Sequence, residues 1–259
     1  MLTGALVEHV RNSGFELVPD LVHLFIGGSE LHGAKVGATD DLDIYGVFVE
    51  SPATALGLTP KDHFVWSTAG DDRRNGPDDV DVTLYSLRRW AELAAKGNAT
   101  ALHFLFADAT SISTPVWTFV QQRTQIFLSK ESAKQFIGFA DNQKQRITGE
   151  KGHGAKGQRP EYIGRFGYDT KAAMHCLRLY FECIDLMENA AITLPRPERS
   201  LLIEVRSGDW SLERFLDEVK SIHERTLAAV ERSKLPERVN KDAISKLVAD
   251  AHFMQWQVR

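Results

Sequence analysis

Two aspartates that alternate with apolar residues constrain this chain more than any other feature of its sequence. Residues 24–49 read LFIGGSELHGAKVGATDDLDIYGVFV, and the part from Leu42 to Val49 is rich in β-branched and aromatic residues. Because the side chains of a strand alternate between its two faces, Asp41 and Asp43 project from the same face. Aspartate is disfavoured in strands, so two on one face indicate a site there.

A glycine-serine turn precedes these aspartates. The apolar run from Val22 to Ile26 predicts a buried strand that ends at Gly27-Gly28-Ser29. Glycines at a strand end let the backbone come close to a ligand, and N–H groups in such a turn bind phosphate oxygens. The Ser29 hydroxyl adds a donor, so the turn predicts a phosphate site beside the two carboxylates.

A third carboxylate comes from the next predicted strand, where Asp81 alternates with apolar neighbours. Asp78 and Asp79 precede it and are alternative sources of that carboxylate. Clustered carboxylates repel one another unless a cation lies between them, and Mg²⁺ or Mn²⁺ suits such oxygen ligands. The pattern therefore predicts a metal site formed by Asp41, Asp43 and Asp81. The alternative is that Asp40 and Asp41 cap a turn and Asp43 is a surface residue of the strand.

The two halves of the chain differ in character. Residues 1–110 mix short apolar strands with helices, whereas residues 111–259 show helical periodicity almost throughout. We therefore expect an α+β fold, in which a small mixed-sheet domain at 1–110 precedes an all-helical domain at 111–259, with the site in the cleft between them. The expected strands are 22–26, 42–49 and 80–85, and the expected helices are 2–12, 86–96, 129–147, 168–189, 211–231 and 240–253, with another from Pro115.

Composition excludes several classes of protein. No apolar run approaches the roughly 20 residues of a membrane span, and the N-terminus has no secretory signal, so we expect a cytoplasmic protein without a membrane partner. Two cysteines, Cys176 and Cys183, exclude a disulfide scaffold and a four-cysteine zinc site. The net charge of −4 counts against a protein that coats nucleic acid through bulk charge. The oligomeric state is not indicated.

Positive charge is nevertheless concentrated in residues 141–178, which contain eight Lys or Arg and four Asp or Glu. Within this segment Lys171, His175 and Arg178 are spaced by four and three residues, which places them in one stripe on a predicted helix. We call these three residues the Lys-His-Arg stripe. It is either a solvated face with salt bridges or a surface that contacts phosphates.

These motifs resemble the nucleotidyltransferase superfamily of DNA polymerase β. That superfamily combines a Gly-Ser turn, two alternating strand aspartates about a dozen residues later and one aspartate on a later strand, here Gly28-Ser29, Asp41, Asp43 and Asp81. More narrowly, the chain resembles the RNA-ligase-associated (RlaP-type) group of predicted nucleotidyltransferases. The stretches that carry this resemblance are GSELHG, DDLDIYGVFVE, GNATALHFLF, YDTKAAMHCLR, LPRP and GDWS, with Asp40 in place of the more common serine.

The resemblance implies an enzyme that transfers a nucleoside monophosphate from an NTP to an acceptor and releases pyrophosphate. Asp41 and Asp43 would bind Mg²⁺ or Mn²⁺, Asp81 would bind metal or act as a base, and Ser29 with the preceding glycines Gly27 and Gly28 would bind the triphosphate. The Lys-His-Arg stripe would also contact the nucleotide. The expected acceptor is an RNA end, in RNA repair or tRNA processing.

The glycine-rich stretch Gly149–Gly167 is expected to be a loop that closes over nucleotide or acceptor. Lys151, Lys156 and Arg159 are its candidate acceptor contacts, and a plain linker is the alternative. Two other functions are weighed: transfer to a protein or small molecule, and a non-catalytic nucleotide-binding or antitoxin-like module. The intact carboxylate set counts against the non-catalytic module.

Overall fold

The computed structural model describes residues 2–16, 18–37, 41–70, 73, 76, 78–108, 112–149 and 159–258. The chain forms an α+β fold, as the sequence predicts, with a mixed sheet in its N-terminal part and many helices after it. It divides into two compact units. The first unit comprises Met1–Lys96, Thr100–Phe127 and Val239–Arg259, and the second comprises Gly97–Ala99 and Leu128–Arg238.

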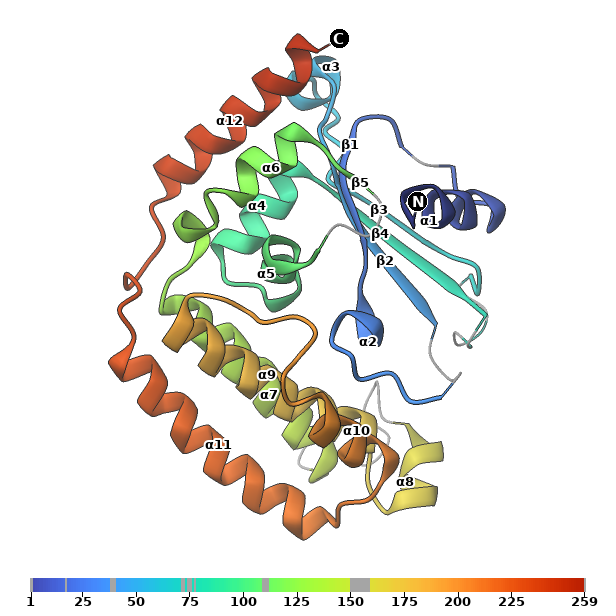
Figure 1. The fold of residues 1–259 in the computed structure, drawn as a ribbon, viewed down its shortest axis with the longest axis vertical. Coiled ribbons are helices and arrows are strands. Elements are labelled where there is room, and N and C mark those ends of the chain that lie inside the picture. Colours follow the sequence, from blue (N-terminus) through green and yellow to red (C-terminus); the bar gives the residue numbers. More distant parts are fainter. Residues whose placement is uncertain are drawn as a thin grey trace. The chain divides into compact units, whose positions relative to one another are not determined.

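In the described residues, a five-stranded sheet forms the centre of the first unit (Figure 1). The strand order is β3-β4-β2-β1-β5, in which β2 and β4 are parallel and the other neighbours are antiparallel. The parallel pair is what brings the starts of β2 and β4 to the same edge of the sheet. The bounds are β1 Leu21–Ile26, β2 Leu42–Phe48, β3 His63–Ser67, β4 Val80–Ser86 and β5 Ile112–Ser113.

The sequence predicts β1, β2 and β4, but not β3 or β5. The edge strand β3 is short, and its alternation is one-sided: Phe64 and Trp66 pack against the core, while Val65 is 69% exposed. An edge strand of this kind lacks the continuous apolar run that a buried strand shows. β5 has two residues, which is too few for any periodicity.

Two helical layers cover the two faces of the sheet (Figure 1). On one face, Val10 of α1 (Leu2–Asn12) packs with Ile44 of β2 and Val82 of β4. The other face packs against α4 (Leu87–Ala95), α5 (Ala99–Phe106) and α6 (Pro115–Gln121). There, Phe104 of α5 meets the ring of Phe25 edge-on, with the centroids 4.8 Å apart. Strand alternation then places Asp43 and Asp81 on the face opposite α1.

Helix starts follow the predicted capping residues. The Ser86 hydroxyl accepts from the Arg89 N–H at the start of α4, and Ser211 and Asn240 cap two later helices in the same way. The remaining helices are α2 Gly28–Leu31, α3 Pro52–Leu56, η1 Thr124–Phe127, α7 Glu131–Ile147, α8 Pro160–Phe166, α9 Thr170–Asn189, α10 Arg199–Ser207, α11 Leu212–Arg232 and α12 Lys241–Gln257.

The second unit is built around α9. This helix packs against α7, α8, α10 and α11. The Tyr180 hydroxyl on α9 lies 2.8 Å from Asp141 Oδ1 on α7 and 3.1 Å from His223 Nδ1 on α11, which links the three helices. Cys176 and Cys183 of α9 are free and buried.

The expectation of a loop from Gly149 to Gly167 is wrong for Pro160–Phe166, which form α8. Proline at the first helical position needs no N–H partner there, and Gly167 ends the helix with φ +83°. A high glycine content therefore does not exclude a short helix in this stretch. Among the described helices, none combines the length and the hydropathy that a bilayer span requires.

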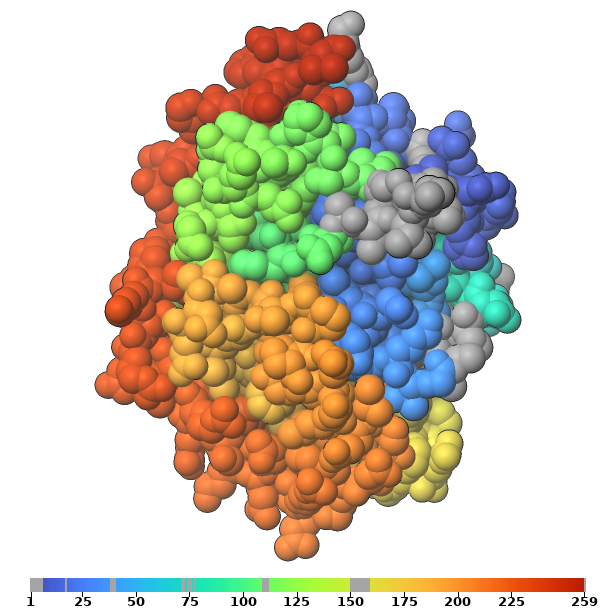
Figure 2. Space-filling view, in the orientation of Figure 1, coloured from blue at the N-terminus to red at the C-terminus, as the bar shows by residue number. Residues whose placement is uncertain are grey.

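The C-terminal helix α12 belongs to the first unit. It packs against α4 and α6, and the space-filling view shows it (red) beside α6 (green) at the surface (Figure 2). By compactness, α6, η1 and α12 belong to the same unit as the sheet. Trp256 Nε1 of α12 donates to the Glu50 carbonyl at 2.8 Å, directly after β2.

A buried side-chain pair, His252 and Glu50, fixes α12 in the same place. His252 Nε2 lies 3.0 Å from the Glu50 carboxylate, and its Nδ1 lies 2.7 Å from the Val248 carbonyl. Both ring nitrogens of His252 are thus held by oxygen atoms, one from its own helix and one from the segment after β2. Burial by itself raises the pKa of Glu50, but hydrogen bonds from His252, the Glu50 backbone and Ser86 together lower it below its ordinary value.

Replacement of His252 by alanine should strongly destabilise the first unit. The Glu50 side chain is fully buried and would lose its main partner, and removing one member of a buried pair costs about 3 kcal/mol. Urea denaturation followed by tryptophan fluorescence measures the free energy of unfolding. Lys246→Ala on the same helix is the control, because its exposed pair with Asp250 contributes below about 1 kcal/mol. Equal stability of the two variants would contradict the role of the buried pair.

Candidate active site

Three carboxylates meet at the edge of the sheet where β2 and β4 begin. Asp43 lies directly opposite Asp81 in the parallel register, and Asp41 immediately precedes β2. Oxygen atoms of the three side chains all lie within 4.8 Å of one another. Among the described residues, neither Asp78 nor Asp79 joins this group. The structure thus brings together the three aspartates that the sequence selects as metal ligands.

This grouping fits a divalent cation. Three carboxylates at this separation repel one another, and each is partly buried, which weakens the screening of that repulsion by water. Carboxylate oxygens are the protein ligands that Mg²⁺ and Mn²⁺ prefer. The donor set therefore agrees with the metal that the resemblance implies.

The glycine-serine turn lies against the same carboxylates. The Gly27 N–H donates to the backbone carbonyl of Asp43 at 2.8 Å, which links the turn to β2. Gly28 has φ +56° and begins α2. A Cβ atom at position 28 would collide with the Asp43 carboxylate, so glycine is what lets the backbone approach it. Ser29 follows at this point of close approach.

Asp79 has a different task from Asp81. It is buried, and its carboxylate accepts from the Thr68 hydroxyl at 2.7 Å, from the Gly76 N–H at 2.6 Å and from both terminal nitrogens of Arg73. Hydrogen bonds from Arg73, then Gly76, then Thr68 hold the pKa of Asp79 well below its usual range. Asp79 therefore links Thr68, Arg73 and Gly76 to the start of β4.

In the second unit, the Lys-His-Arg stripe on α9 forms part of a cationic cluster. Burial, and then the positive charges of Arg178, Lys171, Arg159 and Arg206, lower the pKa of His175 well below its ordinary value. His175 is therefore neutral at pH 7 among four cations. We call these five residues the His175 cluster. Arg and Lys side chains gathered in this way suit phosphate groups.

Part of this charge is balanced within the unit. Arg178 donates to Glu182 Oε1 at 2.9 Å, and Arg159 Nη1 lies 3.5 Å from Asp169 Oδ2. Arg178 Nη2 lies 3.5 Å from His175 Nδ1, so the neutral ring accepts there and keeps Nε2–H as a donor. The Arg178–Glu182 pair is largely buried, unlike a salt bridge on a solvated face, and the stripe also carries the cations expected of a phosphate site.

The predicted acceptor contacts divide between described and undescribed parts of the chain. Lys151 and Lys156 lie outside the described residues, whereas Arg159 belongs to the His175 cluster. No sequence motif singles out Arg206, which also belongs to the His175 cluster. The Thr170 hydroxyl donates to the Arg206 carbonyl at 2.9 Å, which brings the end of α10 to the start of α9. The motif GDWS directly after α10 is the signal that marks this region.

Comparison with known proteins agrees with this geometry. Residues 2–248 match the family described as "RNA repair pathway DNA polymerase beta family". An uncharacterized 38.9 kDa protein from the nrdC-mobD intergenic region of Enterobacteria phage T4 is 29% identical over 136 residues, which is 51% of this chain and 38% of the phage protein. The chain thus spans well under half the length of that relative.

Among solved structures, a nucleotidyltransferase-like protein from Exiguobacterium sibiricum aligns with the whole chain and 75% of its own length, with 11% identity and a TM-score of 0.31. The family match places the chain among the polymerase-β-like nucleotidyltransferases. Because that match covers nearly the whole chain, the protein belongs to the RNA repair pathway DNA polymerase beta family.

Substitution of Gly28 by alanine should displace the Asp43 carboxylate. The left-handed backbone costs a non-glycine residue about 1–2 kcal/mol, and the collision with Asp43 adds to that cost. Gly37→Ala is a matched control, because Gly37 has φ +60° but no atom of the described residues lies within 4 Å of its Cβ position. Thermal denaturation should show a larger loss for Gly28→Ala, and its crystal structure should show Asp43 moved. Equal losses in the two variants would mean that the turn yields without disturbing Asp43.

Proposed function

We propose that this protein transfers a nucleoside monophosphate from an NTP to the hydroxyl of an RNA end, in RNA repair or tRNA processing. The observation that carries the proposal is the convergence of Asp41, Asp43 and Asp81 beside the glycine-serine turn. The family match supports the reaction class and the link to RNA.

Each group in the carboxylate site has a role in this proposal. Asp41, Asp43 and Asp81 would hold a divalent cation, which would neutralise charge on the triphosphate. The Ser29 hydroxyl donates to triphosphate oxygens, and Gly28 lets the backbone come close to them. The acceptor oxygen bonds to the α-phosphorus, the bond to the bridging oxygen breaks, and pyrophosphate leaves with that electron pair. The Asp81 carboxylate would take the hydroxyl proton.

The His175 cluster is the proposed contact for further phosphate groups of the nucleotide. Lys171 and Arg178 supply charge, and neutral His175 supplies a donor that adds no charge. Arg159 would contact the acceptor. The four cations of the cluster support this assignment, because a site of this kind favours dianionic oxygens over neutral ligands.

Conversion of Asp43 or Asp81 to asparagine should reduce transfer by at least about a hundredfold, because each change removes a metal ligand or the base. The fold should survive, and Asp43→Asn should be slightly more stable without metal, since repulsion is relieved. The assay uses labelled NTPs, Mg²⁺ and an RNA oligonucleotide, and EDTA should abolish the signal. Wild-type transfer by either variant would contradict the assignment.

Asp79→Asn is the matched control for a lost carboxylate. It should keep transfer but lower the melting temperature at pH 7, because the loop loses its charged acceptor. The folded pKa of Asp79 lies below its ordinary value, so its contribution to stability is present above that ordinary value and disappears as the pH falls. The difference in melting temperature from wild type should therefore shrink in acid.

The proposal that the acceptor is RNA is tested by measuring RNA binding at increasing salt concentration. Contacts between Lys or Arg and phosphates release counterions. A plot of the logarithm of the association constant against the logarithm of the salt concentration should therefore have a slope of about −0.7 per contact for single strands. The triple variant Lys151→Ala, Lys156→Ala, Arg159→Ala should bind RNA more weakly and with a shallower slope, and it should still bind NTP.

The control for this variant removes the same charge from exposed positions of α11 and the segment after it. It carries Lys220→Ala, Arg225→Ala and Lys234→Ala, all of which change exposed residues. It should bind RNA like the wild type. If neither wild type nor control binds RNA while NTP label appears on protein, the RNA-end proposal is wrong.

A further inference from the structure

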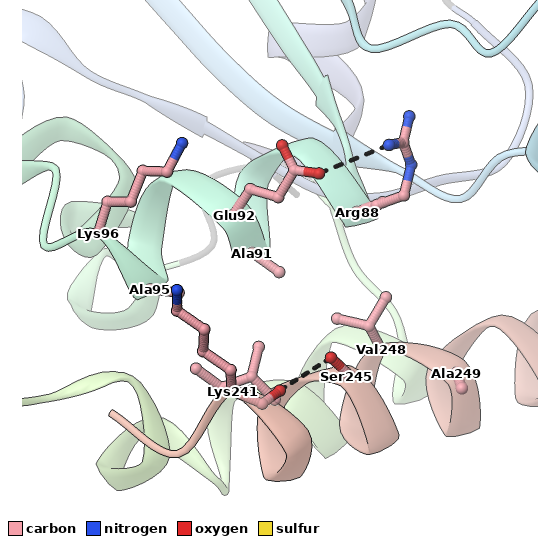
Figure 3. Close-up of a pocket in the computed structure, with 10 residues that line it drawn as sticks. Arg88, Ala91, Glu92, Ala95, Lys96, Lys241, Ser245, Val248 and Ala249 are labelled. Carbon is pink, nitrogen blue, oxygen red and sulfur yellow. Dashed lines mark hydrogen bonds and ion pairs between the residues drawn. The ribbon is translucent and has the colours of Figure 1, made fainter. Parts of the chain in front are cut away.

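A separate pocket of about 510 Å³ lies between α4 and α12 in the first unit (Figure 3). This volume falls within the range of small-molecule sites, about 300–1,000 Å³. No residue of the carboxylate site or of the His175 cluster lines it. The pocket therefore needs an explanation other than the nucleotidyl transfer proposed above.

Both walls of the pocket are anchored. On the α4 side, Trp90 is fully buried and its indole N–H donates to the Ala101 carbonyl at 2.9 Å. On the α12 side, His252 and Trp256 both bond to Glu50. Two helices held in this way keep the space between them open, so the hollow is a fixed feature of the first unit.

The floor of the pocket is apolar. Ala91 and Ala95 come from α4, and Ile244 and Val248 come from α12. The small side chains of the two alanines leave room that larger residues would fill. The Ser245 hydroxyl also lines the pocket but donates to the Lys241 carbonyl at 2.8 Å, so these four apolar side chains favour an apolar occupant.

Charge is divided between the two ends of the pocket. At one end, Arg88 is neutralised by Asp62 at 2.6 Å and Glu92 at 3.5 Å. Lys96 and Lys241 mark the other end, where Lys241 extends from α12 toward α4 (Figure 3). Within the described part of the chain, neither of these ammonium groups has a carboxylate in ion-pair distance. The pocket is therefore apolar along its length and positive at one end.

We propose that this pocket binds a small anionic amphiphile: an aliphatic chain that lies on the alanine, isoleucine and valine floor, with a carboxylate at Lys96 and Lys241. The apolar floor excludes a polar ligand such as a free nucleotide. The length of α4 between positions 88 and 96 is about 12 Å, which suits a medium-length chain. Charge complementarity at the lysine end orients it.

Isothermal titration calorimetry with three ligands of equal chain length but different head-group charge tests the proposal. The ligands are decanoate, decanol and decyltrimethylammonium, each below its micelle concentration. Wild type should bind decanoate most tightly and the cation least. The double variant Lys96→Ala, Lys241→Ala should bind decanoate about tenfold more weakly and bind decanol with unchanged affinity. Ala95→Leu, and Ser245→Leu from the opposite wall, should weaken decanoate and decanol alike, because each fills the apolar space.

Lys246→Ala is the matched control on α12, because Lys246 does not line the pocket and pairs with Asp250. It should bind decanoate like the wild type, and thermal denaturation verifies that every variant is folded. Three results would overturn the proposal: no decanoate binding by wild type, equal binding of decanoate and decanol, or normal binding by both leucine variants. A dimer in sedimentation that Ala95→Leu dissociates would also overturn it, because the occupant would be a second copy of the chain.

Discussion

The parallel pairing of β2 with β4 is the constraint on which the carboxylate site depends. The register that sets Ile44 beside Val82 in the core also sets Asp43 beside Asp81 on the opposite face. A shift of one residue in either strand would send its aspartate into the apolar core and its core residue into the site. Hydrophobic burial on one face of the sheet thus fixes the electrostatics of the other face.

Local patterns account for what the sequence predicts well. Capping residues such as Ser86 and Asn240 act within one helical turn, and the alternation around Asp43 acts within one strand, so each can be read from neighbouring residues. The edge strand β3 escapes prediction because its exposed Val65 interrupts the pattern that burial imposes on inner strands. Its existence depends on pairing with β4, which lies more than a dozen residues away in sequence.

The choice between adjacent aspartates shows the same limit. Asp79 and Asp81 are chemically identical and lie on the same face of an extended chain, so periodicity cannot separate them. They differ in their partners: Arg73 donates to the Asp79 carboxylate, whereas Asp81 lies opposite Asp43 in the sheet. The His175 cluster is a further case, because Arg159 and Arg206 come from segments on either side of α9 and only the tertiary structure brings their charge to His175.

The placement of α12 has a consequence for the order of folding during synthesis. The second unit ends at Arg238, whereas the first unit still needs residues 239–258 to cover α4 and α6. On the ribosome, the helical unit can therefore close before the sheet-containing unit, although the sheet is made first. Until α12 emerges, the Glu50 carboxylate lacks its His252 partner, and α4 and α6 expose an apolar flank that a chaperone can recognise.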